Sequence, residues 1–144
     1  MRLWHIDLLP YLPDAQFRGQ LRELVLIMHQ WRDKGTTNHL LINKVMEYSK
    51  SELASYMWNY CGEYGKRYGD FKENILNEFI DFTDGGKYKF DIFKKWHNKE
   101  YLRVCMANLY EKHFFGVGKS RITDEEWQRL LYGYKTITGE DYVI

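Results

Sequence analysis

Apolar residues recur at helical spacing along most of this chain, and this periodicity constrains the fold more than any other feature of the sequence. In the first long example, four apolar residues lie at positions i, i+4, i+7 and i+11: Phe17, Leu21, Leu24 and Met28. Side chains at these intervals share one face of an α-helix. Asp14 can cap this helix, and Gly35 ends it.

Similar patterns predict helices over residues 49–64, 70–83, 96–115 and 123–131, and a loop with a short helix over residues 38–48. Ser49 and Glu52 have the spacing of a capping box. The alternation typical of a strand is limited to a weak candidate at residues 136–143. The sequence therefore predicts an all-α fold, a single helical domain over residues 1–144 with about four to five helices.

The first twelve residues are too apolar for a disordered start. Their apolar members are Leu3, Trp4, Ile6, Leu8, Leu9 and Leu12. We therefore predict an ordered N-terminal arm. Asp7 and Pro10 interrupt what would be the apolar region of a secretory leader, so these residues do not fit a signal peptide.

Composition narrows the class of protein. An apolar share of 44% excludes wholesale disorder, and a net charge of +1 predicts no partner by itself. Cys61 and Cys105 lack CxxC spacing, which favours a reduced cytosolic protein over a disulfide framework. No apolar run approaches the roughly 20 residues that span a bilayer. We expect a cytoplasmic monomer with no membrane partner.

Positive charge is concentrated in residues 87–121, which contain nine basic and three acidic residues and carry a net charge of +6. The first part of this segment, KYKFDIFKKWH, alternates cations with aromatic rings. Cations beside rings that can stack are typical of surfaces that bind nucleic acid. The alternative is a solvated face over an aromatic core.

Within the helix predicted at 96–115, four polar residues fall in a narrow arc: His97, Tyr101, Asn108 and Lys112. Such a stripe suggests the wall of a polar cleft. The alternative is a set of satisfied interior hydrogen bonds with a surface lysine. The five histidines form no HxxxH or HExxH pair, and no phosphate-binding glycine loop or GxSxG sequence is present. We therefore expect no metal and no other cofactor.

The helix after Asp14 carries Arg18, Arg22 and Glu23. Taken alone, these residues are most often solvated surface charges. The segment LPDAQFRGQLREL, however, resembles the N-terminal segment of the pyrimidine-dimer DNA glycosylase family (the phage endonuclease V type). In that family a short arm leads into a helix with an Arg-Glu pair followed by Leu, matched here by Arg22-Glu23-Leu24.

The resemblance extends over most of the chain in short motifs. YSKSELASYMWNYCGEYGKRYG is similar to the family's middle helix, HNKEYLRVCMANLYEK to its C-terminal helix, and EEWQRLLYGYK to its aromatic C-terminal segment. The resemblance implies a helical DNA-repair enzyme, a glycosylase and AP lyase that acts on damaged or modified bases such as pyrimidine dimers in double-stranded DNA. It also implies chemistry that needs no metal.

In the implied mechanism, an N-terminal α-amine attacks the sugar C1′ and forms an imine, and β-elimination then cuts the backbone. An α-amine has a pKa of about 8 and is partly neutral at physiological pH. The resemblance gives Glu23 the role of acid and base and Arg22 that of holding a phosphate.

Two residues depart from the family pattern. The family's nucleophile is a threonine exposed by removal of the initiator methionine, but Arg2 stands at that position. Because the aminopeptidase pocket excludes long side chains, we expect Met1 to remain and to supply the amine. Leu26 stands where the family tends to place another arginine.

The predicted catalytic residues are therefore Met1, Arg22 and Glu23. The predicted nucleic-acid-binding residues are Arg2, His5, Arg18, Lys94, Lys95, His97, Tyr101, Arg103 and Lys112. Two alternatives remain open. One is a nucleic-acid-binding module of the same fold without catalysis, and the other is a structural or interaction protein in which Arg22 and Glu23 form only a surface pair.

Overall fold

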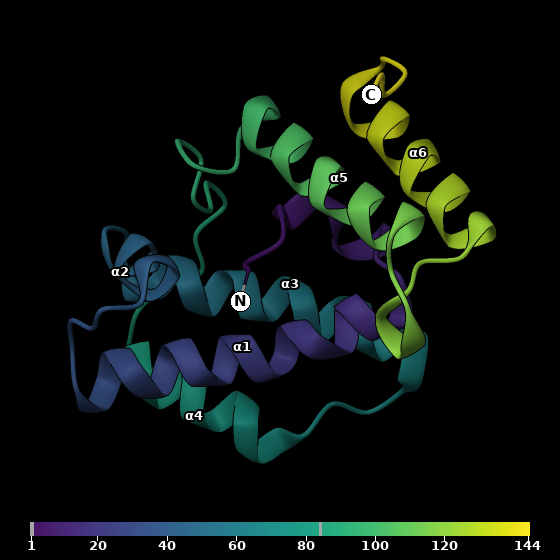
Figure 1. Cartoon of the computed structure of the whole chain (residues 1–144). Coiled ribbons are helices and arrows are strands. Elements are labelled where there is room, and N and C mark those ends of the chain that lie inside the picture. Colours follow the sequence, from purple (N-terminus) through teal and green to yellow (C-terminus); the bar gives the residue numbers. More distant parts are fainter. Residues whose placement is uncertain (1, 84) are drawn as a thin grey trace. The chain divides into compact units, whose positions relative to one another are not determined.

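The computed structural model describes residues 2–83 and 85–144, and the regular secondary structure in these residues is entirely helical (Figure 1). The α-helices are α1 (Asp14–Asp33), α2 (Leu40–Met46), α3 (Lys50–Tyr68), α4 (Glu73–Thr83), α5 (Lys99–Phe114) and α6 (Asp124–Thr138). Two short 3-10 helices are η1 (Ile6–Tyr11) and η2 (Gly118–Ser120). The all-α prediction is confirmed. The described residues hold more helices than the four to five expected, because η1 and η2 are too short to show a clear period. The helix α2 lies within residues 38–48, where a short helix was predicted.

Two helices begin with capping boxes. At the start of α3, Ser49 Oγ accepts a hydrogen bond from Glu52 N, and the Glu52 carboxylate accepts one from Ser49 N. Thr123 and Glu126 repeat this arrangement at the start of α6. Each box satisfies amides that have no partner inside the helix. The box at Ser49 confirms the sequence prediction.

Three local predictions need correction. α5 begins at Lys99 instead of residue 96, because the Asn98 side chain accepts from Tyr101 N over 2.9 Å and caps the helix there. The strand candidate at 136–143 is wrong, because α6 runs to Thr138 and ends at Gly139, which has a φ of 77°. Asp14 is the first residue of α1 and not its cap.

The described residues belong to two compact units. Among the described residues, unit 1 comprises residues 2–3, 21–83 and 85–94, and unit 2 comprises Trp4–Gln20 and Lys95–Ile144. The beginning of α1 therefore belongs to unit 2 and the remainder to unit 1. A single domain over residues 1–144 stays a prediction.

Unit 1 has an apolar core in which α3 packs against α4. The largest side chains of this core belong to Tyr56, Tyr60, Phe79 and Phe93, which are all buried. The α1 side chains Leu24, Ile27 and Met28 are also fully buried. The apolar face predicted for α1 is thus present, although Leu21 is only half-buried.

Unit 2 is built around α6, which packs against both η1 and α5. Gly133 lies at the contact with η1, because a Cβ added there would be 2.5 Å from Cγ of Tyr11. Arg129 strengthens this contact, because its guanidinium donates to the carbonyl of Pro10 over 2.8 Å. Glycine is required at 133 because the Tyr11 ring occupies the space of a side chain.

We predict opposite effects for alanine at two helical glycines. Gly133→Ala should lower the free energy of unfolding by about 1–3 kcal/mol, because its Cβ overlaps the Tyr11 ring. Gly62→Ala in α3 should raise it by about 0.5–1 kcal/mol, because no atom lies within 4 Å of that Cβ and alanine favours the helix. Urea unfolding of both variants measures the difference, and equal effects would contradict the close contact.

Candidate functional site

Two backbone amides of the N-terminal arm bind side chains of α1. In unit 1, Arg2 N donates to Glu23 Oε2 over 3.1 Å. In unit 2, Trp4 N donates to Gln20 Oε1 over 2.8 Å. Amides two residues apart in an extended segment point to the same side, and residues three apart on a helix share a face. The amides of Arg2 and Trp4 therefore point to one side of the arm, and the side chains of Glu23 and Gln20 lie on one face of α1.

The arm needs these acceptors because its side chains are buried. Leu3 is 0% exposed and Trp4 is 6% exposed, so the backbone between them is withdrawn from water. A buried amide without a partner costs about 1–3 kcal/mol. Glu23 and Gln20 remove that cost. The ordered arm predicted from the sequence is confirmed.

Sequence reasoning missed Gln20, which is 1% exposed and binds the arm. A signal for it was present. Gln20 lies three residues after Phe17 and four before Leu24, so it is a polar residue on the apolar face of its own helix. A polar side chain at such a position needs an internal partner.

Of the three predicted catalytic residues, two lie in the described part of the chain. Glu23 is half-buried and holds the Arg2 amide, and Arg22 beside it is exposed. Met1 lies outside the described residues. The geometry thus brings a carboxylate to hydrogen-bond distance of the nitrogen of residue 2, with an exposed guanidinium next to it in the sequence.

The other predicted basic residues near the arm and before α5 are surface side chains. Arg18 in unit 2 binds Asp14 over 3.1 Å, and both are exposed. Lys94 in unit 1 lies 3.8 Å from Asp91, again with both exposed. Lys95 in unit 2 is exposed. These cations are accessible to an anionic ligand.

The polar residues predicted on α5 have separate environments. The guanidinium of Arg103 donates to the Tyr134 hydroxyl over 3.3 Å and to the Val143 carbonyl over 3.0 Å, and it lies over the Tyr142 ring. Asn108 donates to the carbonyl of Val104 in its own helix. Lys112 is half-buried. Arg103 is therefore held by the C-terminal residues of unit 2.

His97 lies before α5 and is part of an aromatic cluster in unit 2. Its ring stacks on that of His5, with 5.2 Å between ring centroids, and it also contacts Trp96 and Tyr101. His97 Nδ1 accepts from Ile6 N over 3.0 Å, and His5 Nδ1 accepts from Asp7 N over 3.1 Å. His5 and His97 are only 3% and 8% exposed, and the Nδ1 atom of each serves as an interior acceptor.

Burial disfavours the charged form of both imidazole rings in this cluster. It lowers the pKa of His97 to about 2, with the nearby His5 adding to the effect. Burial also lowers the pKa of His5, although the Asp7 carboxylate opposes this shift. Both Nδ1 atoms accept hydrogen bonds, which a protonated ring nitrogen could not do.

Residues 2–83 and 85–144 contain no group of three or more His, Cys, Asp or Glu side chains arranged to hold a metal ion. Cys61 and Cys105 are free thiols, and burial raises the pKa of Cys61 to about 12. Among the described helices, none has the length and apolar character required to cross a membrane.

Comparison with protein families identifies a family that this chain matches. The model of the family described as pyrimidine dimer DNA glycosylase covers residues 1–77, more than half of the chain. The chain belongs to the pyrimidine dimer DNA glycosylase family. The matched residues include the arm, the Arg22-Glu23 pair and Gln20, and the family predicted from the sequence is confirmed. No curated protein and no solved structure matches this chain.

The buried histidine pair predicts acid sensitivity. The pKa of His97 in the folded protein is about 2. In the unfolded chain the pKa of His97 should be about 6.5. Below that pH the unfolded chain takes up a proton that the folded protein refuses, so stability falls as the pH falls. His97 alone should cost about 2 kcal/mol between pH values of about 7.5 and 5.

The substitution His97→Asn isolates this effect, because the Asn side-chain oxygen can still accept from Ile6 N and does not titrate. We expect a flatter dependence of the free energy of unfolding on pH in this variant, measured by urea unfolding at several pH values. A variant with the same slope as the parent protein would show that His97 is protonated in the folded state.

Proposed function

We propose that this protein is a DNA glycosylase and AP lyase that removes a damaged or modified base from duplex DNA through an amine at the start of its chain. Membership of the pyrimidine dimer DNA glycosylase family supports DNA as the substrate. The observation that carries the proposal is the 3.1 Å hydrogen bond from Arg2 N to Glu23 Oε2.

This hydrogen bond supports the proposal because it holds the start of the chain against a carboxylate. One residue of chain spans at most about 3.6 Å, and the α-amine proposed on Met1 is one residue from the nitrogen that this carboxylate binds. Loss of Met1 would leave the amine on the nitrogen of Arg2 itself. In either form the amine and Glu23 can act on one sugar.

The chemistry proceeds in two stages. The neutral amine forms a bond to C1′ of the nucleotide while the bond from C1′ to the base breaks, and the base leaves with the electron pair and a proton. Opening of the sugar ring then gives an imine. Removal of a C2′ proton breaks the bond between C3′ and its phosphate oxygen, which cuts the strand.

Glu23 can serve both stages. Its carboxylate takes up a proton from the attacking amine, passes that proton to the departing base and stabilises positive charge at C1′. The same group can then accept the C2′ proton. Arg22 is exposed on α1 and can pair with a DNA phosphate near the sugar. Arg2, Arg18, Lys94 and Lys95 are the further basic residues proposed to contact the backbone.

We predict that borohydride will trap a covalent adduct between the protein and a duplex that contains an abasic site. The mass of the first peptide should carry the adduct, and acetylation of the terminal amine should abolish it. Glu23→Gln should lower the rate of trapping by about 10²- to 10⁴-fold, because glutamine still accepts from Arg2 N but takes up no proton.

Glu47→Gln is the matched control, because Glu47 is an exposed carboxylate in unit 1 whose partner is Lys44. It should leave trapping unchanged. An adduct on an internal lysine would refute the terminal amine as nucleophile. Absence of any adduct, together with DNA binding that Glu23→Gln does not alter, would instead establish a binding module without catalysis.

A further inference from the structure

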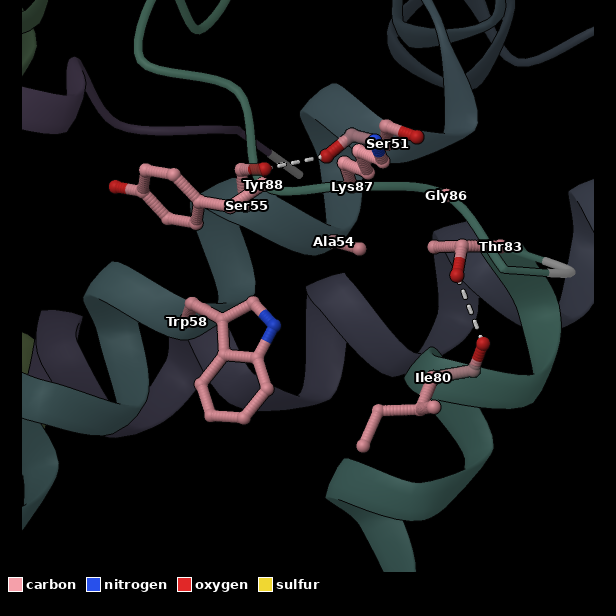
Figure 2. A pocket seen from close by; sticks show the side chains of 9 residues that line it. All are labelled: Ser51, Ala54, Ser55, Trp58, Ile80, Thr83, Gly86, Lys87 and Tyr88. Carbon is pink, nitrogen blue, oxygen red and sulfur yellow. Dashed lines mark hydrogen bonds between the residues drawn. The ribbon is translucent and has the colours of Figure 1, made fainter.

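Unit 1 contains a hollow of about 260 Å³ between α3, the end of α4 and the segment that follows it (Figure 2). It is lined by Ser51, Ala54, Ser55, Trp58, Ile80, Thr83, Gly86, Lys87 and Tyr88. Sites for drug-sized ligands typically measure about 300–1,000 Å³. The hollow is smaller, so a suitable occupant is a single flat ring system and not an extended chain.

The walls of the hollow are apolar and open to solvent. Figure 2 shows the indole of Trp58 and the side chain of Ile80 on opposite sides, with Ala54 between them. Trp58, Ile80 and Tyr88 are 44%, 45% and 44% exposed. Phe90, whose ring contacts that of Tyr88, is 90% exposed. Accessible large apolar side chains that adjoin one another are typical of a binding surface.

Hydrogen bonds fix the shape of this surface without a ligand. The Ser55 hydroxyl donates to the Ser51 carbonyl over 2.6 Å and accepts from Lys89 N over 2.8 Å. Asn59 Nδ2 donates to the Tyr88 hydroxyl over 2.8 Å. The segment after α4 passes close to Ser51 at Gly86. A Cβ at this position would overlap Ser51 Oγ, so the close approach requires glycine. The Tyr88 side of the hollow is thus held in place before any ligand arrives.

The polar groups of the hollow favour an anionic ligand. Lys87 lies on its lining, Lys89 is two residues further along the chain, and none of the nine lining residues is acidic. The Ser51 hydroxyl and the Trp58 indole N–H can bond to the edge of a heterocycle. A flat aromatic ring that carries a phosphate meets all three requirements of size, stacking and charge.

From this geometry we propose that the hollow binds one unpaired nucleotide of a DNA strand, with its base stacked on Trp58 and its phosphate near Lys87. The site is separate from Glu23 in the sequence and takes no part in the chemistry proposed there. Stacking on an aromatic side chain tolerates any base, so the site should favour single strands without a preference for a particular sequence. It would hold a strand that has lost its partner.

The test is the binding of a labelled ten-residue oligothymidylate, measured by fluorescence anisotropy and compared with the blunt duplex of the same sequence and with thymidine monophosphate. The single strand should bind more tightly than the monophosphate, and binding of the single strand, but not of the duplex, should depend on Trp58. Trp58→Ala should weaken its binding by about 5- to 150-fold, and Trp58→Phe, which keeps a ring, should retain most of the affinity. Lys87→Gln should reduce the salt dependence by about 0.7 in the log–log slope.

Phe114→Ala is the matched control, because Phe114 is an aromatic residue of unit 2 that is 64% exposed and lies outside the hollow. Circular dichroism should show the same helix content in every variant. Unchanged binding in Trp58→Ala, or an equal loss in Phe114→Ala, would overturn the proposal. Tighter binding of the monophosphate than of the strand would overturn it as well.

The outcome can be separated from that of the proposed function. Glu23→Gln should bind the single strand as the parent protein does. If Trp58→Ala also leaves this binding unchanged while borohydride trapping still depends on Glu23, only the nucleotide site is refuted. If trapping fails while the strand binds through Trp58, only the proposed catalysis is refuted.

Discussion

Burial of Leu3 and Trp4 is the constraint on which the candidate site depends. Once these side chains leave water, the amides around them need acceptors, and Glu23 and Gln20 of α1 provide them. The carboxylate that the proposed chemistry requires is therefore also a structural anchor of the arm. This double use explains why the start of the chain and the Arg-Glu pair belong together, although about twenty residues separate them in the sequence.

Helices were the most predictable part of this fold. The 3.6-residue period of α1 and the capping box at Ser49 are local signals, and both are present in the structure. Errors arose where two local signals compete. The sequence allows a helix that begins at Trp96 and also one that is capped by Asn98. The hydrogen bond from Tyr101 N to the Asn98 side chain shows that Asn98 is the cap. Thr136 and Thr138 favour strands, but α6 continues through them.

The site was less predictable, because side-chain environments depend on packing between distant segments. The sequence shows Gln20 as a polar residue on the apolar face of its helix. It does not show that the partner of this side chain is Trp4 N. The hollow at Trp58 had no sequence signal, since its walls come from α3, α4 and residues 86–88. The aromatic residues of the basic segment differ in exposure, because Phe93 is fully buried whereas Phe90 is almost fully exposed.

The close approach of Tyr11 to Gly133 has an evolutionary consequence. The ring fills the volume that any other residue at position 133 would need, so the two positions cannot change independently. A related protein with alanine or serine at 133 should carry a smaller residue at 11, and one that keeps an aromatic ring at 11 should keep glycine at 133. These two positions form a coupled pair whose joint history can be followed as sequences diverge.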